Sequence, residues 1–162
     1  MRTSTLLTAA FAAIVGFILA IGQPQASGHC QVPCGIYDDP MRITMLKEDA
    51  ATIRKSVVSL ESLIQGAGDI TALNQSVRWI GVKEETATNI QRVVSDYFLT
   101  QRVKAVPSDD AGYGAYLDQL AKMHAILTAA MKCKQTADLE AVGALEAAID
   151  AIAPMYVHEH DG

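Results

Sequence analysis

The sequence contains too few cysteines for a disulfide-stapled fold. Only Cys30, Cys34 and Cys133 are present, so one thiol is left over when two of them pair. A metal or redox site therefore suits this count better than structural cross-links, and Cys133 is expected to be a partly buried free thiol. A disulfide between Cys30 and Cys34 stays open as the alternative, because such bonds persist in exported proteins.

Positive charge is also scarce. The chain has 13 Lys and Arg residues against 18 Asp and Glu residues, which gives a net charge of −5. No basic stripe exists to neutralise phosphates, so nucleic acid is excluded as a partner. A small anionic substrate would gain nothing from the overall charge, so any attraction for it must be local.

No run alternates apolar and polar residues for long enough to make a sheet. Apolar residues instead recur at steps of three and four, which is the spacing of an amphipathic helix. They do so in four segments with mostly short connections, so the sequence predicts an all-α domain, an up-down-up-down four-helix bundle over residues 39–154. Residues 155–162, which include His158 and His160, are expected to be a flexible tail.

Capping and turn residues predict where these helices begin and end. The first helix is expected to start at Asp39-Pro40 and to end at Gly66-Ala67-Gly68. The second is expected to start at Asp69, and the third at Pro107-Ser108-Asp109-Asp110. The fourth is expected to start at Thr136 and to stop before Pro154. The expected core-facing stripes are Ile43, Leu46, Ala50, Ile53, Val57, Leu60 and Ile64; Ile70, Leu73, Val77, Ile80, Ala87, Ile90, Val94 and Tyr97; Tyr113, Leu117, Leu120, His124, Leu127 and Met131; and Leu139, Val142, Leu145, Ile149 and Ile152.

Residues 1–28 are predicted to be a secretory signal peptide. Arg2 supplies a positive start, Leu6 to Ile21 is an apolar run, and Ala26-Ser27-Gly28 provides small residues for cleavage by signal peptidase. The cut would give an exported, periplasmic or secreted protein whose first residue is His29. An uncleaved membrane anchor is the alternative, because the run approaches the shortest membrane-spanning length. Since Arg2 is the only charged residue removed, the net charge of the mature chain would be −6.

Residues 29–38, here called the hook, have the donor set of a transition-metal site if the chain begins at His29. The α-amine of His29, the amide nitrogen of Cys30 and the thiolates of Cys30 and Cys34 can form a plane of two nitrogens and two sulfurs. The His29 imidazole can reach the metal only from above or below that plane. Such a site suits nickel(II) or copper(II), whereas zinc prefers a tetrahedron. Thiolate and anionic amide donors also make a trivalent state accessible.

The hook, with the pattern His-Cys-x-x-Pro-Cys-Gly-x-Tyr, resembles the N-terminus of the nickel-containing superoxide dismutases. The resemblance implies a four-helix bundle that assembles as a homohexamer and converts superoxide to oxygen and hydrogen peroxide by Ni(II)/Ni(III) cycling. It implies nickel ligands at His29, Cys30 and Cys34, and a catalytic Tyr37 that gates and orients small anions. Tyr97, in Ser95-Asp96-Tyr97-Phe98, is a further candidate for the surroundings of the hook.

The chain departs from the family pattern in the residues that support the ligands. Gln31 stands where many members have aspartate, and no glutamate precedes Glu48 on the first helix to hold the axial imidazole. Arg78 and Lys83 are the candidates for the family's supporting arginine. These departures keep a second hypothesis open, an exported helical nickel- or copper-binding or delivery protein without turnover. A third is a membrane-anchored bundle with a disulfide loop.

Overall fold

The computed structural model describes residues 35–65 and 68–157 of the 162-residue chain. Within these residues it consists of helices and contains no strand: α2 (Asp39–Ile64), α3 (Ile70–Val93) running directly into the π-helical η1 (Val94–Arg102), α4 (Tyr113–Gln135) and α5 (Leu139–Tyr156). None of the helices described is long and apolar enough to cross a membrane. The predicted signal peptide, the predicted ligands His29, Cys30 and Cys34, and residues 158–162 lie outside the described residues.

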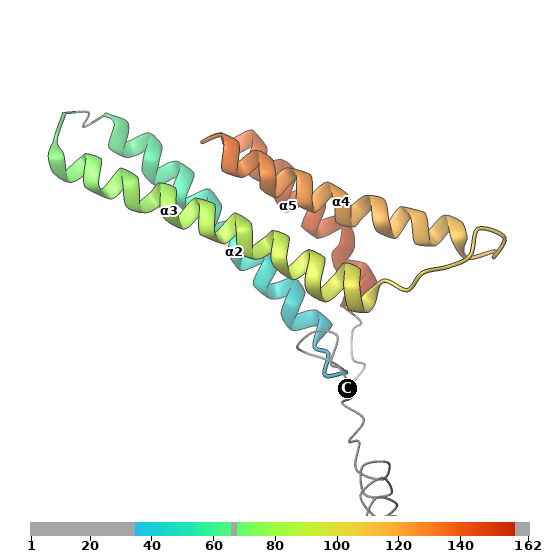
Figure 1. Ribbon diagram of the computed structural model, residues 1–162. Helices are drawn as coiled ribbons and strands as arrows, with labels where there is room; N and C mark the ends of the chain where they lie inside the picture. The colour runs from blue at the N-terminus through green and yellow to red at the C-terminus, as the bar shows by residue number, and fades with distance from the viewer. Residues whose placement is uncertain (1–34, 66–67, 158–162) are drawn as a thin grey trace, which may run out of the picture. The chain divides into compact units, whose positions relative to one another are not determined.

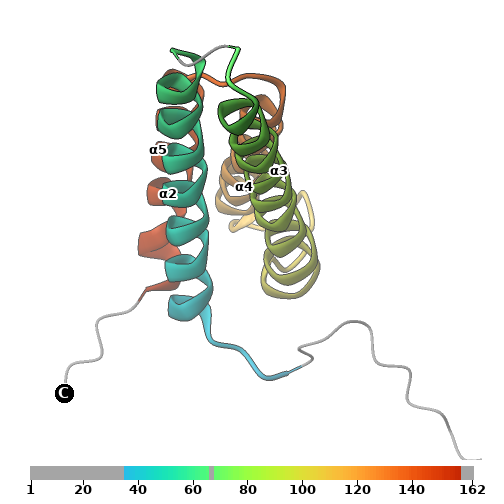
Figure 2. The same cartoon turned by 90° about the vertical axis from the view of Figure 1, so that its left-hand side faces the viewer.

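The helices form the predicted bundle. α2 packs against α3 and α5, and α4 packs against the same two helices, so each helix has two helical neighbours. Successive helices run in opposite directions, with α2 beside α5 and α3 beside α4 (Figures 1 and 2). The prediction of an all-α, up-down-up-down four-helix bundle is therefore confirmed.

The expected stripes of α2 and α5 supply much of the core. On α5, four of the five expected residues are fully buried, Val142, Leu145, Ile149 and Ile152. On α3, only half of the residues predicted to face the core are buried. Ala87, Ile90, Val94 and Tyr97 are buried. Ile70, Leu73, Val77 and Ile80 are exposed, because none of the described helices packs over this face of the first half of α3.

The predicted face of α4 was wrong by about one residue. The helix buries Met123, Ile126, Ala130 and Cys133, whereas Leu117, His124 and Met131 from the expected stripe are exposed. α4 is rich in alanine, leucine and methionine on several sides, so its sequence is compatible with more than one buried face. Packing against α3 and α5 decides between them.

The first helix begins one residue earlier than the sequence suggested. Asp38 is the N-cap, and its carboxylate accepts a 2.9 Å hydrogen bond from the backbone N–H of Met41. Asp39 and Pro40 therefore occupy the first two helical positions. This shift leaves the side chain of Asp39 available for tertiary contacts.

Three other predicted boundaries also move. α5 begins at Leu139 with Asp138 as its N-cap, three residues after the predicted start at Thr136, which instead caps the end of α4. Pro107 to Asp110 forms a turn, with the Asp110 N–H bonded to the Pro107 carbonyl, and α4 begins only at Tyr113. α5 does not stop before Pro154 but continues through it to Tyr156. A proline so near the end removes little of the hydrogen-bond ladder, and burial of the Tyr156 ring stabilises the last turn.

Candidate functional site

Tyr37 lies at the end of the bundle where α2 begins, three residues after Cys34 in the sequence. Its side chain is partly exposed, at 39%. The edge of its ring meets the Tyr97 ring at a centroid distance of 5.8 Å and an interplanar angle of 80°. The guanidinium carbon of Arg102 lies 4.5 Å from the centroid of the Tyr37 ring. Tyr37 is thus the more exposed ring of the Tyr37–Tyr97 pair, and the guanidinium of Arg102 lies over its face.

The π-helical segment η1 brings Tyr97 and Arg102 together. These residues are five positions apart, a spacing that an α-helix would place on different faces. A π-helix forms i to i+5 contacts, and the Val103 N–H accordingly donates to the Phe98 carbonyl at 2.8 Å. The wider turn therefore presents both side chains to the start of α2.

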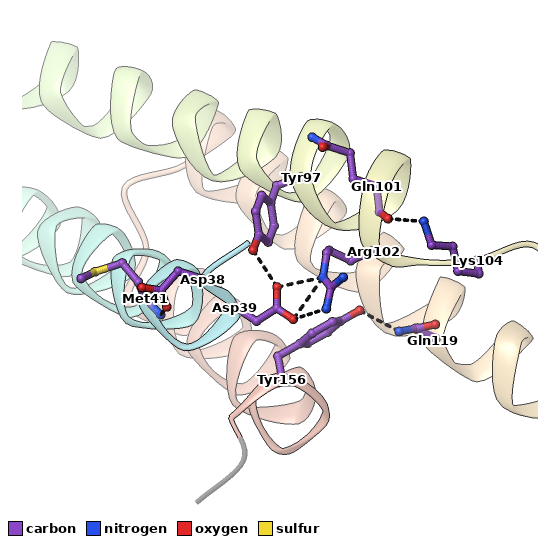
Figure 3. Close-up of polar contacts among 9 residues, drawn as sticks. All are labelled: Asp38, Asp39, Met41, Tyr97, Gln101, Arg102, Lys104, Gln119 and Tyr156. Atoms are coloured by element: carbon purple, nitrogen blue, oxygen red, sulfur yellow. Dashed lines mark hydrogen bonds and ion pairs between the residues drawn. The ribbon is translucent and has the colours of Figure 1, made fainter. Parts of the chain in front are cut away.

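Asp39 is the centre of the polar contacts at this end of the bundle (Figure 3). The Tyr97 hydroxyl donates to its Oδ1 at 2.6 Å. Arg102 donates from Nε to Oδ1 at 2.9 Å and from Nη2 to Oδ2 at 2.6 Å, a two-pronged ion pair. The Asp39 side chain is only 14% exposed. We call Tyr37, Asp39, Tyr97 and Arg102 the Asp39 cluster.

These contacts determine the protonation of Tyr97. Burial, and then the hydrogen bond and negative charge of Asp39, raise the pKa of its hydroxyl far above the ordinary value of 10.0. The same carboxylate raises the pKa of Arg102. Tyr97 therefore stays protonated and acts as a fixed hydrogen-bond donor to Asp39.

Aromatic packing ties the Asp39 cluster to the other helices. The Phe98 ring packs edge-on against Tyr97 at 5.0 Å and against Tyr156 of α5 at 4.7 Å. The Tyr156 hydroxyl accepts a 2.7 Å hydrogen bond from Gln119 of α4. On the other side, the guanidinium carbon of Arg42 lies 5.0 Å from the centroid of the Tyr97 ring. All four helices thus contribute to the position of Tyr97.

Among the described residues, neither candidate for a supporting arginine contacts Tyr37 or the Asp39 cluster. Arg78 is exposed in the first half of α3. Lys83 is 4% exposed and donates to the backbone carbonyls of Cys133 and Lys134, so it caps the end of α4. The charged residues beside Tyr37 are instead Asp39 and Arg102, which sequence reasoning missed. The adjacent acids Asp38 and Asp39 were the available signal, because one residue is enough to cap a helix.

The predicted metal ligands His29, Cys30 and Cys34 are not among the residues described. Between residues 35 and 65 and between 68 and 157, no group of three or more His, Cys, Asp or Glu side chains is arranged to hold a metal ion. Cys133 is a free thiol, as expected, but it is fully rather than partly buried, and burial raises its pKa.

Comparison with known proteins gives one match. The model of the family described as nickel-containing superoxide dismutase matches residues 24–160, which is most of the chain and includes the hook. Neither the curated proteins nor the solved structures gave a match. The chain therefore belongs to the nickel-containing superoxide dismutase family, and is an oxidoreductase with nickel as its cofactor and superoxide as its substrate.

Proposed function

We propose that the mature enzyme begins at His29 and holds nickel through the hook. His29 would contribute its α-amine and imidazole, Cys30 its amide nitrogen and thiolate, and Cys34 its thiolate. This donor set fits nickel(II), which accepts a plane of nitrogen and sulfur ligands. The observation that carries the proposal is the order of the motif, in which all five donors precede Tyr37 within nine residues directly behind a cleavage signal.

Nickel bound in this way supplies one-electron chemistry by alternating between its divalent and trivalent states. The protein has to bring a small anion and protons to it. Tyr37 suits this task because it is partly exposed and follows Cys34 by only three residues. We assign to its hydroxyl the gating of the site and the orientation of superoxide and of the water that delivers protons.

Tyr97 has a different role, although it touches Tyr37. Its side chain is only 3% exposed and its proton is bonded to Asp39. The raised pKa means that this hydroxyl does not release its proton near neutral pH. Tyr97 therefore supports the ring of Tyr37, and Tyr37 is the tyrosine in contact with solvent and substrate.

We also propose that the enzyme is exported and works as a homohexamer. The apolar leader with its small-residue cleavage site supports export through signal peptidase. The exposed apolar half of α3 supports assembly, because a second copy of the chain would remove it from water.

The decisive experiment examines the naturally processed protein. Intact mass and N-terminal sequencing should give a chain that begins at His29, and metal analysis should give one nickel per chain. A start one residue away would remove the proposed amine and imidazole donors and would contradict the ligand set. His29→Gln, made in the same precursor, should retain the fold by circular dichroism while losing superoxide decay activity. Equal activity in both proteins would instead favour metal binding by the hook without a role in turnover.

A further inference from the structure

The Asp39 carboxylate connects the start of α2, which directly follows the hook, to η1 at the same end of the bundle. Asp39 is the first residue of α2 and follows Cys34 by five residues. Its hydrogen-bond partners Tyr97 and Arg102 belong to η1, about sixty residues further along the chain. Both carboxylate oxygens are used, and the bonds to Arg102 form the two-pronged geometry that fixes orientation as well as distance.

Both surfaces that contact the ring of Tyr37 depend on this carboxylate. The guanidinium over the face of the ring is oriented by its ion pair with Asp39. The Tyr97 ring at the edge of Tyr37 is held by its hydroxyl bond to the same side chain. Tyr37 itself is partly exposed. Loss of the Asp39 charge would therefore release the face contact and weaken the edge contact together.

We propose that Asp39 and Arg102 are positioning residues, whose ion pair holds Tyr37 and the root of the hook in the orientation that the nickel site requires. This inference rests on the proposed ligand set and on the proposed role of Tyr37. Neither Asp39 nor Arg102 is a catalytic residue in it, because both act through Tyr37 and the backbone that leads to Cys34. The first turns of α2 contain no glutamate that could support the nickel ligands. In this proposal, the Asp39–Arg102 pair supports them instead.

A second ion pair in the bundle provides a matched control. Arg54 of α2 donates from Nε and Nη2 to the two carboxylate oxygens of Glu146 on α5, at 2.7 and 2.6 Å. Its geometry is the same as that of the Asp39–Arg102 pair, and it is also partly buried. It lies four helical turns along α2 from the start of the helix. Breaking it tests the effect of losing such a pair on stability alone.

The test uses the naturally processed, nickel-loaded protein with the variants Asp39→Asn, Arg102→Gln and the double variant, and the controls Arg54→Gln and Glu146→Gln. Nickel retention is measured against a competing chelator, and the nickel site is recorded by electron paramagnetic resonance. We expect each site variant to lose nickel about tenfold faster and to broaden the spectrum, as changes around metal ligands commonly do. The double variant should match Asp39→Asn, because the change at Asp39 already breaks the ion pair with Arg102. The control variants should lower the melting temperature without changing either nickel measurement.

The proposal is overturned if the site variants lower the melting temperature as the controls do but keep the nickel spectrum and retention of the parent protein. Should Asp39→Asn or Arg102→Gln fail to fold, Arg102→Lys replaces them. This variant keeps the positive charge but removes the planar guanidinium that lies over the Tyr37 ring. An unchanged spectrum in Arg102→Lys then contradicts the proposal, and a broadened one supports it. Failure of the proposed ligand set appears separately, as parent protein that lacks His29 at its start or lacks a nickel signal.

Discussion

At the residue scale, the Asp39 cluster concentrates charge around two tyrosines. Arg102 covers Tyr37 and is neutralised by Asp39, whereas Arg42 lies over Tyr97. Arg42 forms no salt bridge with any residue in the part of the chain that the structure describes. In a chain with a net charge of −5, we expect this guanidinium to attract superoxide locally.

Arg42→Gln should lower the rate constant for superoxide decay on the order of threefold at low ionic strength, because the local attraction is lost. The difference from the parent enzyme should shrink at high salt, where exposed charges are screened. Pulse radiolysis over a series of salt concentrations measures both effects. Lys55→Gln, which removes one positive charge further along α2 beside Trp79, is the control and should leave the rate almost unchanged. Equal losses in the two variants would argue against a local effect of Arg42.

The raised pKa of Tyr97 predicts a pH dependence of stability. The folded chain holds this proton more tightly than the unfolded chain, whose tyrosine titrates near the ordinary value of 10.0. Its stabilising contribution is therefore complete below about pH 10 and is lost as the pH rises above that value. Urea unfolding should show a steeper decline above pH 10 in the parent protein than in Tyr97→Phe. Parallel declines in the two proteins would show that Tyr97 is not responsible.

At the element scale, the start of α2 and the π-helical η1 are the two features that build the Asp39 cluster. Helical periodicity correctly indicated four helices, but it carries no information about a change from α to π hydrogen bonding within one helix. The pairing of residues five apart, Tyr97 and Arg102, was therefore invisible in the sequence. The N-cap of α2 could not be assigned from the sequence, because Asp38 and Asp39 are both suitable capping residues.

A second element-scale feature is the cap that α3 provides for α4. The buried ammonium of Lys83 donates to the carbonyls of Cys133 and Lys134, at 2.6 and 2.9 Å, among the last carbonyls of that helix. Lys83→Met should reduce the free energy of unfolding by about 1–3 kcal/mol, because these carbonyls lose their donor while the volume stays similar.

The control for Lys83 is Lys122→Met. Lys122 pairs with Asp118 on the surface of α4, one helical turn away, so its loss should change the free energy of unfolding by less than about 0.5 kcal/mol. Urea denaturation of the three proteins measures the difference. A Lys83 variant as stable as the Lys122 variant would show that the cap contributes little.

At the scale of the whole molecule, the apolar end of the α2–α3 pair is left uncovered. Leu73, at 60% exposed, lies with Ile70 and Val77 on a face of α3 that none of the described helices covers. A groove of about 630 Å³ runs beside them, lined largely by apolar side chains of α2 and α3. Such a surface is typical of an interface in an assembled protein.

Leu73→Glu should therefore convert the proposed hexamer into smaller species, because it would bury a charge at the proposed interface. Sedimentation velocity measures the change, and far-ultraviolet circular dichroism should show that the helices persist. Ala121→Glu, at an exposed position of α4, is the control and should sediment like the parent protein. Identical sedimentation of the parent and Leu73→Glu would show that this surface is not the interface.

The sequence by itself determined the class of fold and the identity of the family. Apolar spacing is a local property that decides helix formation, and the hook motif is a contiguous pattern that can be recognised without the rest of the chain. Only the tertiary structure decided which face of α4 is buried, which half of α3 stays exposed, and which residues surround Tyr37. The physical reason is that these outcomes depend on contacts between distant segments, such as the bonds from Tyr97 and Arg102 to Asp39, about sixty residues away.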